Sequence, residues 1–210
     1  MAAGVAVVGM LAAPQVTMAQ GGMGATAMVR DANGRMVGTA VLSEVAGGVR
    51  ITMQAQGLPA GRHGIHLHAV GMCEPPAFTS AGGHFNPTNQ QHGLNNPSGP
   101  HAGDLPELTA AANGTASYSA TNTMVTLSAG PNSLFDADGT ALVIHAQPDD
   151  QVTDPTGNSG DRIACGTLVR GASALPATGS AAAPLIPVGA GAVAGLAAWA
   201  GALVRRRRAR

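Results

Sequence analysis

The sequence predicts an all-β domain between about residues 22 and 172, built as an antiparallel β-sandwich or flattened barrel. Three observations lead to this prediction. Apolar and polar residues alternate with period two in "VRITMQAQ" (Val49 to Gln56), as in a strand with one buried face. "DANG" (Asp31 to Gly34) lies between two β-like runs and is typical of a hairpin turn. No segment of this body has a convincing helical period.

Eight candidate strands follow in chain order, and their core must consist of Val, Ile, Leu, Met and Ala because aromatic residues are scarce. Two intervals, about residues 69–114 and 148–161, interrupt the regular spacing of the strands. Loops of that length are usually functional or disordered, and the first holds three of the seven histidines, so we expect it to be functional. The strands are expected near 24–31, 36–44, 48–56, 62–68, 115–120, 123–129, 140–147 and 162–170.

The charge distribution excludes one class of function. The chain has no lysine, and five of its eleven arginines lie in the last six positions. The body therefore carries six arginines against eleven acidic residues, a balance of 6 − 11 = −5. Nucleic-acid binding requires a basic surface, so we expect no nucleic-acid partner.

The first residues are typical of a segment that directs export. Residues 1–19 form a short apolar run that closes on small residues, which predicts a signal peptide cleaved after Ala19. The run lacks the usual preceding Lys or Arg, so a longer signal and a buried N-terminal helix are alternatives.

Residues 173–210 predict attachment to the cell surface. "LPATG" (Leu175 to Gly179) precedes an apolar stretch of 24 residues, Ala181 to Val204, and then "RRRRAR". The stretch is long enough to span a bilayer, and the arginines would stay on the cytoplasmic side. The arrangement resembles a Gram-positive sorting signal, in which sortase cleaves between Thr178 and Gly179 and joins Thr178 to cell-wall peptidoglycan. Because only "GASA" separates the domain from the motif, a simple membrane anchor is the alternative. Either way, we expect an exported, extracellular domain.

Two histidines two residues apart open the functional argument. His66 and His68 lie in the predicted strand "GIHLHAVG", so both side chains leave the same face and could approach one metal ion. The alternative is a pair of ordinary half-buried histidines. His63, three residues before His66, faces the other way on a regular strand and is expected to be structural or exposed.

The first long loop supplies a second candidate set. Three imidazoles and a carboxylate fall within 21 residues, and glycines and prolines let the loop fold back on itself. Such a set suits tetrahedral zinc, whereas His145, in the apolar "ALVIHAQ", could join His66 and His68 in a nitrogen-rich copper(II) site. A histidine-rich surface loop without metal is the alternative. The zinc candidates are His84, His92, His101 and Asp104.

The motifs "GIHLHAVG", "SAGGHFNP", "HAGDLPEL", "LVIHAQPDD" and "GNSGDRIACG" resemble, in order, those of copper/zinc superoxide dismutases over about residues 24–170, with "GDLP" similar to the bacterial secreted branch. The resemblance implies an eight-stranded Greek-key barrel with two functional loops. It implies one copper and one zinc per subunit, with His84 bridging both. It makes the copper ligands His66, His68, His84 and His145, and the zinc ligands His84, His92, His101 and Asp104.

The resemblance also implies an activity: dismutation of superoxide anions to oxygen and hydrogen peroxide, with copper cycling between Cu(II) and Cu(I) and zinc structural. His84 and Arg162 would be the catalytic residues, since His84 gives up a proton and Arg162 attracts the anion. Asp149 would hydrogen-bond a copper histidine and a zinc histidine, here His66 and His92. The family includes dimers and monomers, so a homodimer stays open.

The two cysteines, Cys73 and Cys165, are expected to form a disulfide, because pairs in exported domains usually do. Other functions are less well supported by the sequence. Copper carriers use soft Cys or Met ligands more often, and the nine methionines are scattered. A copper-only relative would lack some of the zinc set, and a purely structural surface domain needs no ligands at all.

Overall fold

The computed structural model describes residues 23–172. This part of the chain contains nine β-strands and one turn of 3-10 helix, η1. Their bounds are β1 (Met23–Asp31), β2 (Met36–Val45), β3 (Gly48–Ala55), β4 (Gly61–His63), β5 (Ile65–His68), η1 (Thr79–Ala81), β6 (Leu108–Ala110), β7 (Ala116–Asn122), β8 (Ala141–His145) and β9 (Arg162–Ala172).

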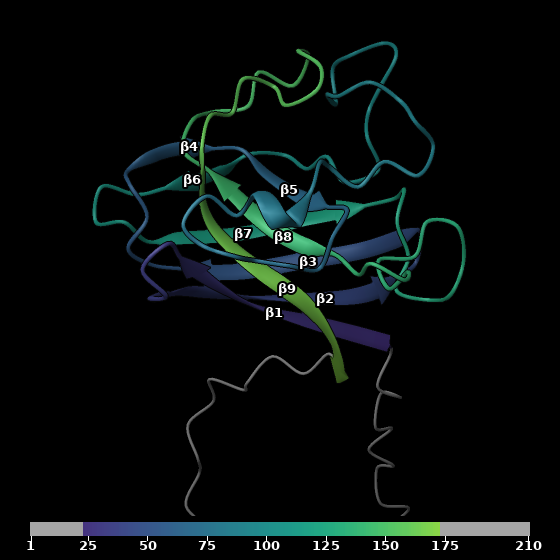
Figure 1. The fold of residues 1–210 in the computed structure, drawn as a ribbon, viewed down its shortest axis with the longest axis horizontal. Coiled ribbons are helices and arrows are strands. Elements are labelled where there is room, and N and C mark those ends of the chain that lie inside the picture. Colours follow the sequence, from purple (N-terminus) through teal and green to yellow (C-terminus); the bar gives the residue numbers. More distant parts are fainter. Residues whose placement is uncertain (1–22, 173–210) are drawn as a thin grey trace, which may run out of the picture. The chain divides into compact units, whose positions relative to one another are not determined.

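Seven strands form one antiparallel sheet in the order β5-β8-β9-β1-β2-β3-β7, and β4 and β6 form a small second sheet. The large sheet curls around the apolar core (Figure 1). In β3 the buried positions alternate as predicted, with Val49, Ile51 and Met53 inside and Arg50 exposed. The predicted all-β antiparallel fold, a flattened barrel with almost no helix, is confirmed.

The predicted strand 62–68 is divided into β4 and β5 at Gly64. The Gly64 N–H donates to the Gln147 carbonyl, so the chain turns from one sheet to the other at this residue. A Cβ at Gly64 would lie 2.8 Å from Ser159 Cβ, and therefore only glycine fits this crossing without movement.

The prediction of a strand at 123–129 is wrong, because the described residues form no strand between β7 and β8. A carboxylate explains the difference. Glu44 Oε1 accepts hydrogen bonds from Leu127 N at 2.7 Å and Ser128 N at 3.0 Å, and from the Thr126 hydroxyl at 2.5 Å. A side chain on β2 thus satisfies the backbone donors that a neighbouring strand would otherwise pair. The short strand β6, by contrast, lies inside the interval predicted as loop.

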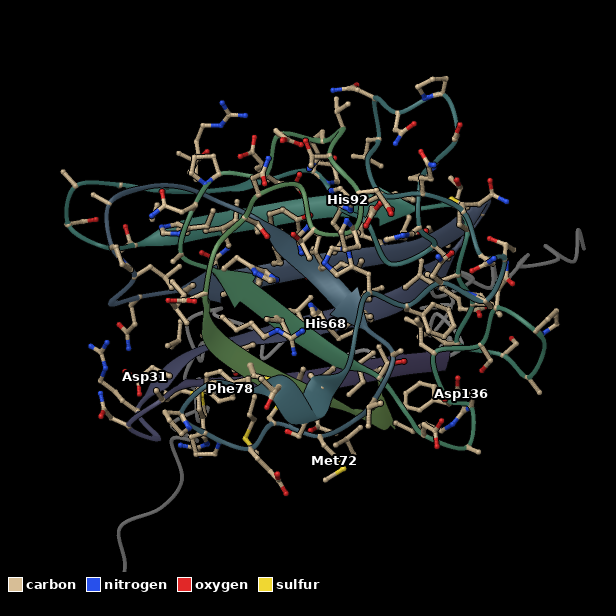
Figure 2. All side chains as sticks on the ribbon, turned by 45° about the horizontal axis from the view of Figure 1, so that its top comes forward. Asp31, His68, Met72, Phe78, His92 and Asp136 are labelled. Atoms are coloured by element: carbon tan, nitrogen blue, oxygen red, sulfur yellow. A yellow bond between two sulfur atoms is a disulfide. The ribbon has the colours of Figure 1, made fainter. Side chains whose placement is uncertain are left out.

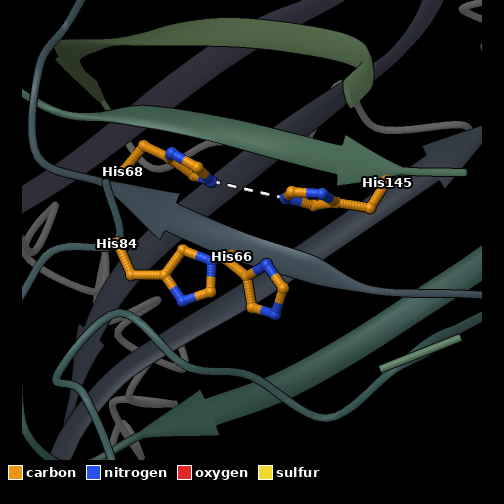
Figure 3. A group of neighbouring side chains, drawn as sticks. All are labelled: His66, His68, His84 and His145. Carbon is orange, nitrogen blue, oxygen red and sulfur yellow. Dashed lines mark hydrogen bonds between the residues drawn. The ribbon is translucent and has the colours of Figure 1, made fainter. Parts of the chain in front are cut away.

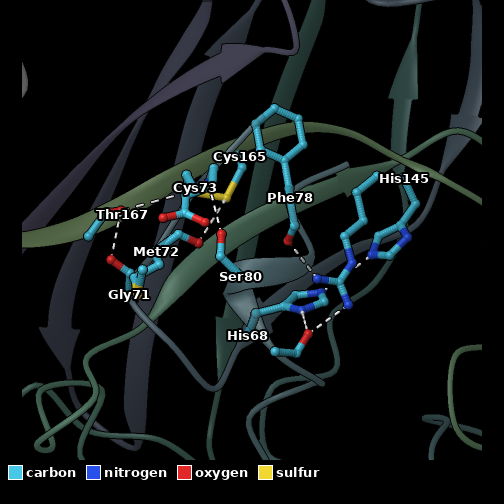
Figure 4. Close-up of a disulfide and its surroundings, with 12 residues drawn as sticks. His68, Gly71, Met72, Cys73, Phe78, Ser80, His145, Cys165 and Thr167 are labelled. Atoms are coloured by element: carbon cyan, nitrogen blue, oxygen red, sulfur yellow. Dashed lines mark hydrogen bonds between the residues drawn. A yellow bond between two sulfur atoms is a disulfide. The ribbon is translucent and has the colours of Figure 1, made fainter. Parts of the chain in front are cut away.

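Both long loops leave the same side of the large sheet (Figure 1). The predicted disulfide Cys73–Cys165 is confirmed, and it joins residues 92 apart in sequence. It ties the loop after β5 to β9 (Figure 4). Closing a loop of this length stabilises the fold by about 4–5 kcal/mol at most in the chain-entropy model.

Residues 23–172 contain no helix that is both long and apolar enough to cross a membrane. The predicted signal peptide (1–19) and the predicted sorting signal and apolar segment (173–210) lie outside the described residues.

Candidate metal centre

The pairing of β5 with β8 brings three histidines together. His66 and His68 point to one face of β5, as their spacing predicts, and both are fully buried. His145 ends the neighbouring strand, and an irregularity in the β8–β9 register falls between Ile144 and His145. Such irregularities redirect side chains. His68 and His92 lie in the middle of the molecule, between the sheet and the loops (Figure 2).

Hydrogen bonds fix the protonation of two of these rings. His68 Nδ1 donates to the Gly82 carbonyl at 3.0 Å, and His145 Nδ1 donates to the Gly160 carbonyl at 3.1 Å. A carbonyl oxygen can only accept, so each neutral ring carries its proton on Nδ1 and a lone pair on Nε2. The two Nε2 atoms lie 3.4 Å apart, joined by the dashed line in Figure 3. Two lone pairs that face each other are suited to binding a shared metal ion.

The other two nitrogens of the cluster meet the same requirement. His66 Nε2 donates to Asp149 Oδ2 at 2.6 Å, which leaves a lone pair on His66 Nδ1. His66 Nδ1 and His84 Nε2 are buried, and neither has a hydrogen-bond partner. One nitrogen each of His66, His68, His84 and His145 lies within 4.8 Å of the others. Four imidazole nitrogens with free lone pairs fit a copper(II) ion.

Burial keeps three rings of this cluster, those of His66, His68 and His145, neutral. It lowers the pKa of His66 to about 3 and that of His145 to about 4, and it lowers the pKa of His68 well below the usual value. The neighbouring His84 lowers all three further. Around pH 7 these three rings therefore offer a metal their lone pairs without first losing a proton.

The predicted zinc residues also converge. Asp104 Oδ1 lies 3.0 Å from His84 Nδ1, 2.9 Å from His92 Nδ1 and 3.6 Å from His101 Nδ1. His101 Nδ1 lies 3.3 Å from His84 Nδ1. Four donors about 2.0–2.1 Å from one zinc ion stand about 3.3–3.4 Å apart at the corners of a tetrahedron. The donor set thus fits zinc in both size and chemistry.

By proximity alone, His66 rather than His101 groups with His84, His92 and Asp104. The one nitrogen of His66 with a free lone pair, Nδ1, already belongs to the first cluster, because Nε2 donates to Asp149. His101, whose Nδ1 lies 3.3 Å from His84 Nδ1, is therefore the better fourth donor. Asp104 Oδ2 accepts from Gly93 N at 2.8 Å and His101 N at 2.9 Å. One carboxylate oxygen therefore holds the loop while the other faces the zinc position.

The carboxylates set the charge of this half of the site. Burial favours a neutral Asp104, but hydrogen bonds from His84 and His92 hold its pKa well below the usual range. Burial likewise lowers the pKa of His92, but its bonds to Asp104 and Asp149 outweigh burial and raise the pKa to about 9. His92 is therefore a cation at neutral pH when no metal is bound.

Asp149 connects the two halves. Its Oδ2 accepts from His66 Nε2, and its Oδ1 accepts from His92 Nε2 at 3.0 Å. The carboxylate is buried, and its own backbone N–H donates to Glu107 Oε1 at 3.0 Å. Sequence reasoning missed Glu107, because no motif signals a carboxylate that holds another carboxylate's backbone.

Arg162, the first residue of β9, stands beside the copper position. Its guanidinium donates to the carbonyls of Phe78 at 2.7 Å and Gly82 at 2.6 Å, and Gly82 O also accepts from His68. Among the ion pairs of the described residues there is none between Arg162 and the adjacent Asp161. Figure 4 shows Phe78 between the disulfide and the histidines. The loop tied down by Cys73 therefore orients the arginine.

An open cleft of about 730 Å³ gives solvent access to this arginine and to the histidine cluster. The cleft wall comes from both long loops and from the ends of β5, β8 and β9. Its lining residues are His68, Gly83, His84, Asn86, His101, His145, Pro155, Thr156, Asn158, Gly160 and Arg162.

Two further residues have structural roles near the metals. His63 is buried, and its ring nitrogens face the carbonyls of His145 at 2.8 Å and Pro59 at 2.9 Å, so it is structural, one of the two predicted alternatives. Gly157 has φ +61°, and a Cβ there would overlap Asp149 Oδ1 and lie 2.6 Å from His92 Nε2. Sequence reasoning missed Gly157, although the "TGNSG" run marks a turn.

Comparisons with known proteins agree with this geometry. A family model described as copper/zinc superoxide dismutase (SODC) matches residues 36–168. "Superoxide dismutase [Cu-Zn] 2" of Aquifex aeolicus is 50% identical over 137 residues, covering 64% of this chain and 80% of the relative. "Superoxide dismutase [Cu-Zn]" of Caulobacter vibrioides is 40% identical over 147 residues, covering 69% and 84%.

Solved structures give the same result. A double mutant of a SOD-like protein from Bacillus subtilis matches with a TM-score of 0.66 and 41% identity, covering 68% of this chain and 95% of that one. The Cu/Zn superoxide dismutase from Brucella abortus matches with a TM-score of 0.57 and 30% identity, covering 69% and 98%.

The fold and the paired donor sets define a two-metal β-barrel protein. More narrowly, the chain belongs to the copper/zinc superoxide dismutase family, and copper and zinc are its cofactors.

We expect Gly157→Ala to reduce the affinity for both metals by about 10–100-fold, the range found when a ligand's outer partner is disturbed. The added methyl group would displace Asp149, which orients one ring on each side of the site. Competition with chelators measures both affinities. Gly34→Ala is the matched control, since Gly34 has φ +78° with nothing within 4 Å of the added atom. Equal metal affinities in the two variants would contradict this prediction.

Zinc binding to the metal-free chain at pH 7.5 should release about one proton, because His92 with a pKa of about 9 must become neutral to bind metal. The release should fade as the pH rises above 9, where His92 is already neutral. Calorimetry in two buffers of different ionisation enthalpy measures it. Zinc uptake without proton release at pH 7.5 would disprove the charge assigned to His92.

Proposed function

We propose that this chain catalyses the dismutation of superoxide, the activity for which its relatives are named: two superoxide anions and two protons give oxygen and hydrogen peroxide. One observation carries the proposal. His84 directs Nδ1 toward the zinc donors and leaves Nε2 buried and unpartnered beside the copper donors. A single imidazole shared between two metals is a site built for coupled electron and proton transfer rather than for storage.

The proposed ligands follow from the donor atoms. Copper would be held by His66 Nδ1 and by Nε2 of His68, His84 and His145, and zinc by Nδ1 of His84, His92 and His101 with Asp104 Oδ1, one ion of each per chain. Copper supplies the one-electron redox change that the reaction needs, and zinc supplies fixed charge without redox chemistry.

Arg162 would attract and orient the substrate. The side chains of the body carry a formal net charge of −5 before metals are counted, so a local cation beside the copper would add attraction for the anion. The Arg162 guanidinium lies at the cleft, and its partners are neutral carbonyls, which leave its positive charge uncompensated. Such local fields can raise association rates by about 10–10³-fold.

His84 would handle the proton. Its Nε2 is the atom of the bridging ring that can lose and regain a proton while Nδ1 stays with the zinc donors. Asp149 keeps His66 and His92 in fixed orientation on either side of this ring, so the site does not have to rearrange as the proton moves.

A copper carrier on the same fold is less well supported. Carriers exchange metal through accessible soft ligands, whereas both cysteines of this chain are joined in a disulfide and the copper histidines are buried.

We infer further that the domain is exported through a signal peptide at residues 1–19 and held at the cell surface through residues 173–210, in defence against superoxide outside the cell. The support is the order of "LPATG", the apolar stretch and the arginines in the sequence. The disulfide is in keeping with an oxidising compartment. Attachment to the wall by sortase is the favoured form, with a membrane anchor as the alternative.

We expect Arg162→Ala, in the chain loaded with copper and zinc, to lower the second-order rate of superoxide decay at least about tenfold and to flatten its fall with salt. Pulse radiolysis across a salt series measures both effects. Arg50→Ala is the control, because it removes an exposed arginine of equal charge on β3. With a chelator present to remove free copper, a rate for the loaded wild type no faster than that of the metal-free chain would refute the dismutase proposal. Equal losses in both variants would refute the role of Arg162.

In a Gram-positive host with sortase, we expect the full chain to be bound to the wall and released by muramidase. Thr178→Ala should move it to the membrane fraction, because the residue joined to the wall is changed. Fractionation and immunoblotting measure the distribution. Wild-type chain found entirely in the membrane fraction would exclude wall linkage and favour the membrane anchor.

A further inference from the structure

The two long loops touch through a carboxylate that no motif assigned to the site. Asp154, in the loop after β8, accepts a hydrogen bond from the backbone N–H of His92 at 2.6 Å. The same oxygen, Oδ1, lies 3.5 Å from Nε2 of His101. Asp154 thus contacts two of the residues that form the proposed zinc site.

The loop that carries Asp154 does not use this side chain for its own structure. The turn of that loop is held by Asp150, whose carboxylate accepts from Val152 N, Thr153 N and the Asn158 amide. Within residues 23–172, the contacts of the Asp154 side chain run instead to the loop that carries His92 and His101. The contacts of this carboxylate therefore point to two of the proposed zinc ligands and not to its own turn.

We propose that Asp154 is a positioning residue of the zinc site, which holds His92 through its backbone and His101 through its imidazole. The proposal rests on the zinc ligands proposed above. Because His101 Nδ1 faces the other zinc donors, the ring proton lies on Nε2, which is the atom that faces Asp154. A carboxylate at that position fixes the ring orientation and makes the metal-binding nitrogen more basic.

Asp149 and Asp154 thus contact the predicted zinc residues at different atoms. Asp149 is fully buried and bonds His92 Nε2, whereas the Asp154 side chain is 46% exposed. At 3.5 Å its contact with His101 is electrostatic rather than a short hydrogen bond. We therefore expect Asp154 to have a smaller effect on zinc binding than a buried carboxylate would.

Asp154 also connects the loop of the proposed zinc ligands to the wall of the cleft. Pro155, Thr156 and Asn158, which follow directly, line the cleft beside Arg162. Asp154 immediately precedes this segment and is hydrogen-bonded to His92 in the other loop. It therefore helps to hold one wall of the cleft in place.

The test compares Asp154→Asn, Asp154→Glu and Asp150→Asn with wild type, all as full chains. The first removes the charge at nearly constant shape, the second restores it, and the third loosens the same loop without touching a histidine. Three quantities are measured: the rate of zinc transfer to a chelator, the visible spectrum of cobalt(II) bound in place of zinc, and copper affinity. The superoxide decay rate of wild type is measured in parallel.

Asp154→Asn should release zinc about tenfold faster, the lower end of the range for outer partners of ligands. It should also shift the cobalt(II) bands, which a general loosening of the loop would not do, and it should leave copper affinity nearly unchanged. Asp154→Glu should recover part of the loss.

Zinc release from Asp154→Asn at the wild-type rate would overturn the proposal, as would an equal acceleration in Asp150→Asn. If wild type binds both metals and dismutates superoxide in those cases, only the role of Asp154 fails. If wild type binds no zinc, the proposed function fails with it.

Discussion

The rest of the metal centre depends on the hydrogen bonds that the buried carboxylate of Asp149 accepts from two histidines. The carboxylate is an anion inside the protein, and a buried anion is tolerated only when donors surround it. Its two oxygens therefore bond His66 on the copper side and His92 on the zinc side, and the burial that would raise its pKa is outweighed by these bonds. One charge thereby fixes the ring orientation of both halves. The close passage of Gly157 over this carboxylate follows from the same constraint, since no side chain fits there.

Part of the metal centre lies on strands and part lies on a loop, and different contacts hold each part in place. The proposed copper ligands His66, His68 and His145 lie on adjacent strands of the curled sheet, where the pleat and the pairing register determine their directions. The predicted zinc residues come from the first long loop, which pairs with β5 through isolated bridges at His84 and Asp104 and is held further by the second oxygen of Asp104. The disulfide fixes the intervening segment to β9. The loop is thus fixed by its backbone pairing with β5, by a carboxylate and by a disulfide.

Much of this could be read from the sequence, for reasons that are local. His66 and His68 share a face because strands have period two, and the ligand types at their spacings resemble one family closely. The failures have tertiary causes. The segment 123–129 alternates like a strand, but Glu44, about 80 residues away in the chain, takes its backbone donors. The break at Gly64 depends on Ser159, and the role of Asp154 depends on which loop it meets. Such contacts leave no periodic signal in one sequence.

Because the side chains of the body are acidic on balance, the groups around Arg162 determine how strongly it can attract an anion. An acidic domain repels an anion at long range, and salt screens that repulsion beyond about 8–10 Å. A side-chain cation close to the metal whose charge is not cancelled therefore adds to the attraction of the metal ion itself. A carboxylate partner would orient the guanidinium equally well but would remove its field. The carbonyls of Phe78 and Gly82 orient it without doing so, and burial lowers its pKa without a nearby anion to oppose the effect. Because the Gly82 carbonyl also accepts from His68, the same peptide group orients the guanidinium and a proposed copper ligand.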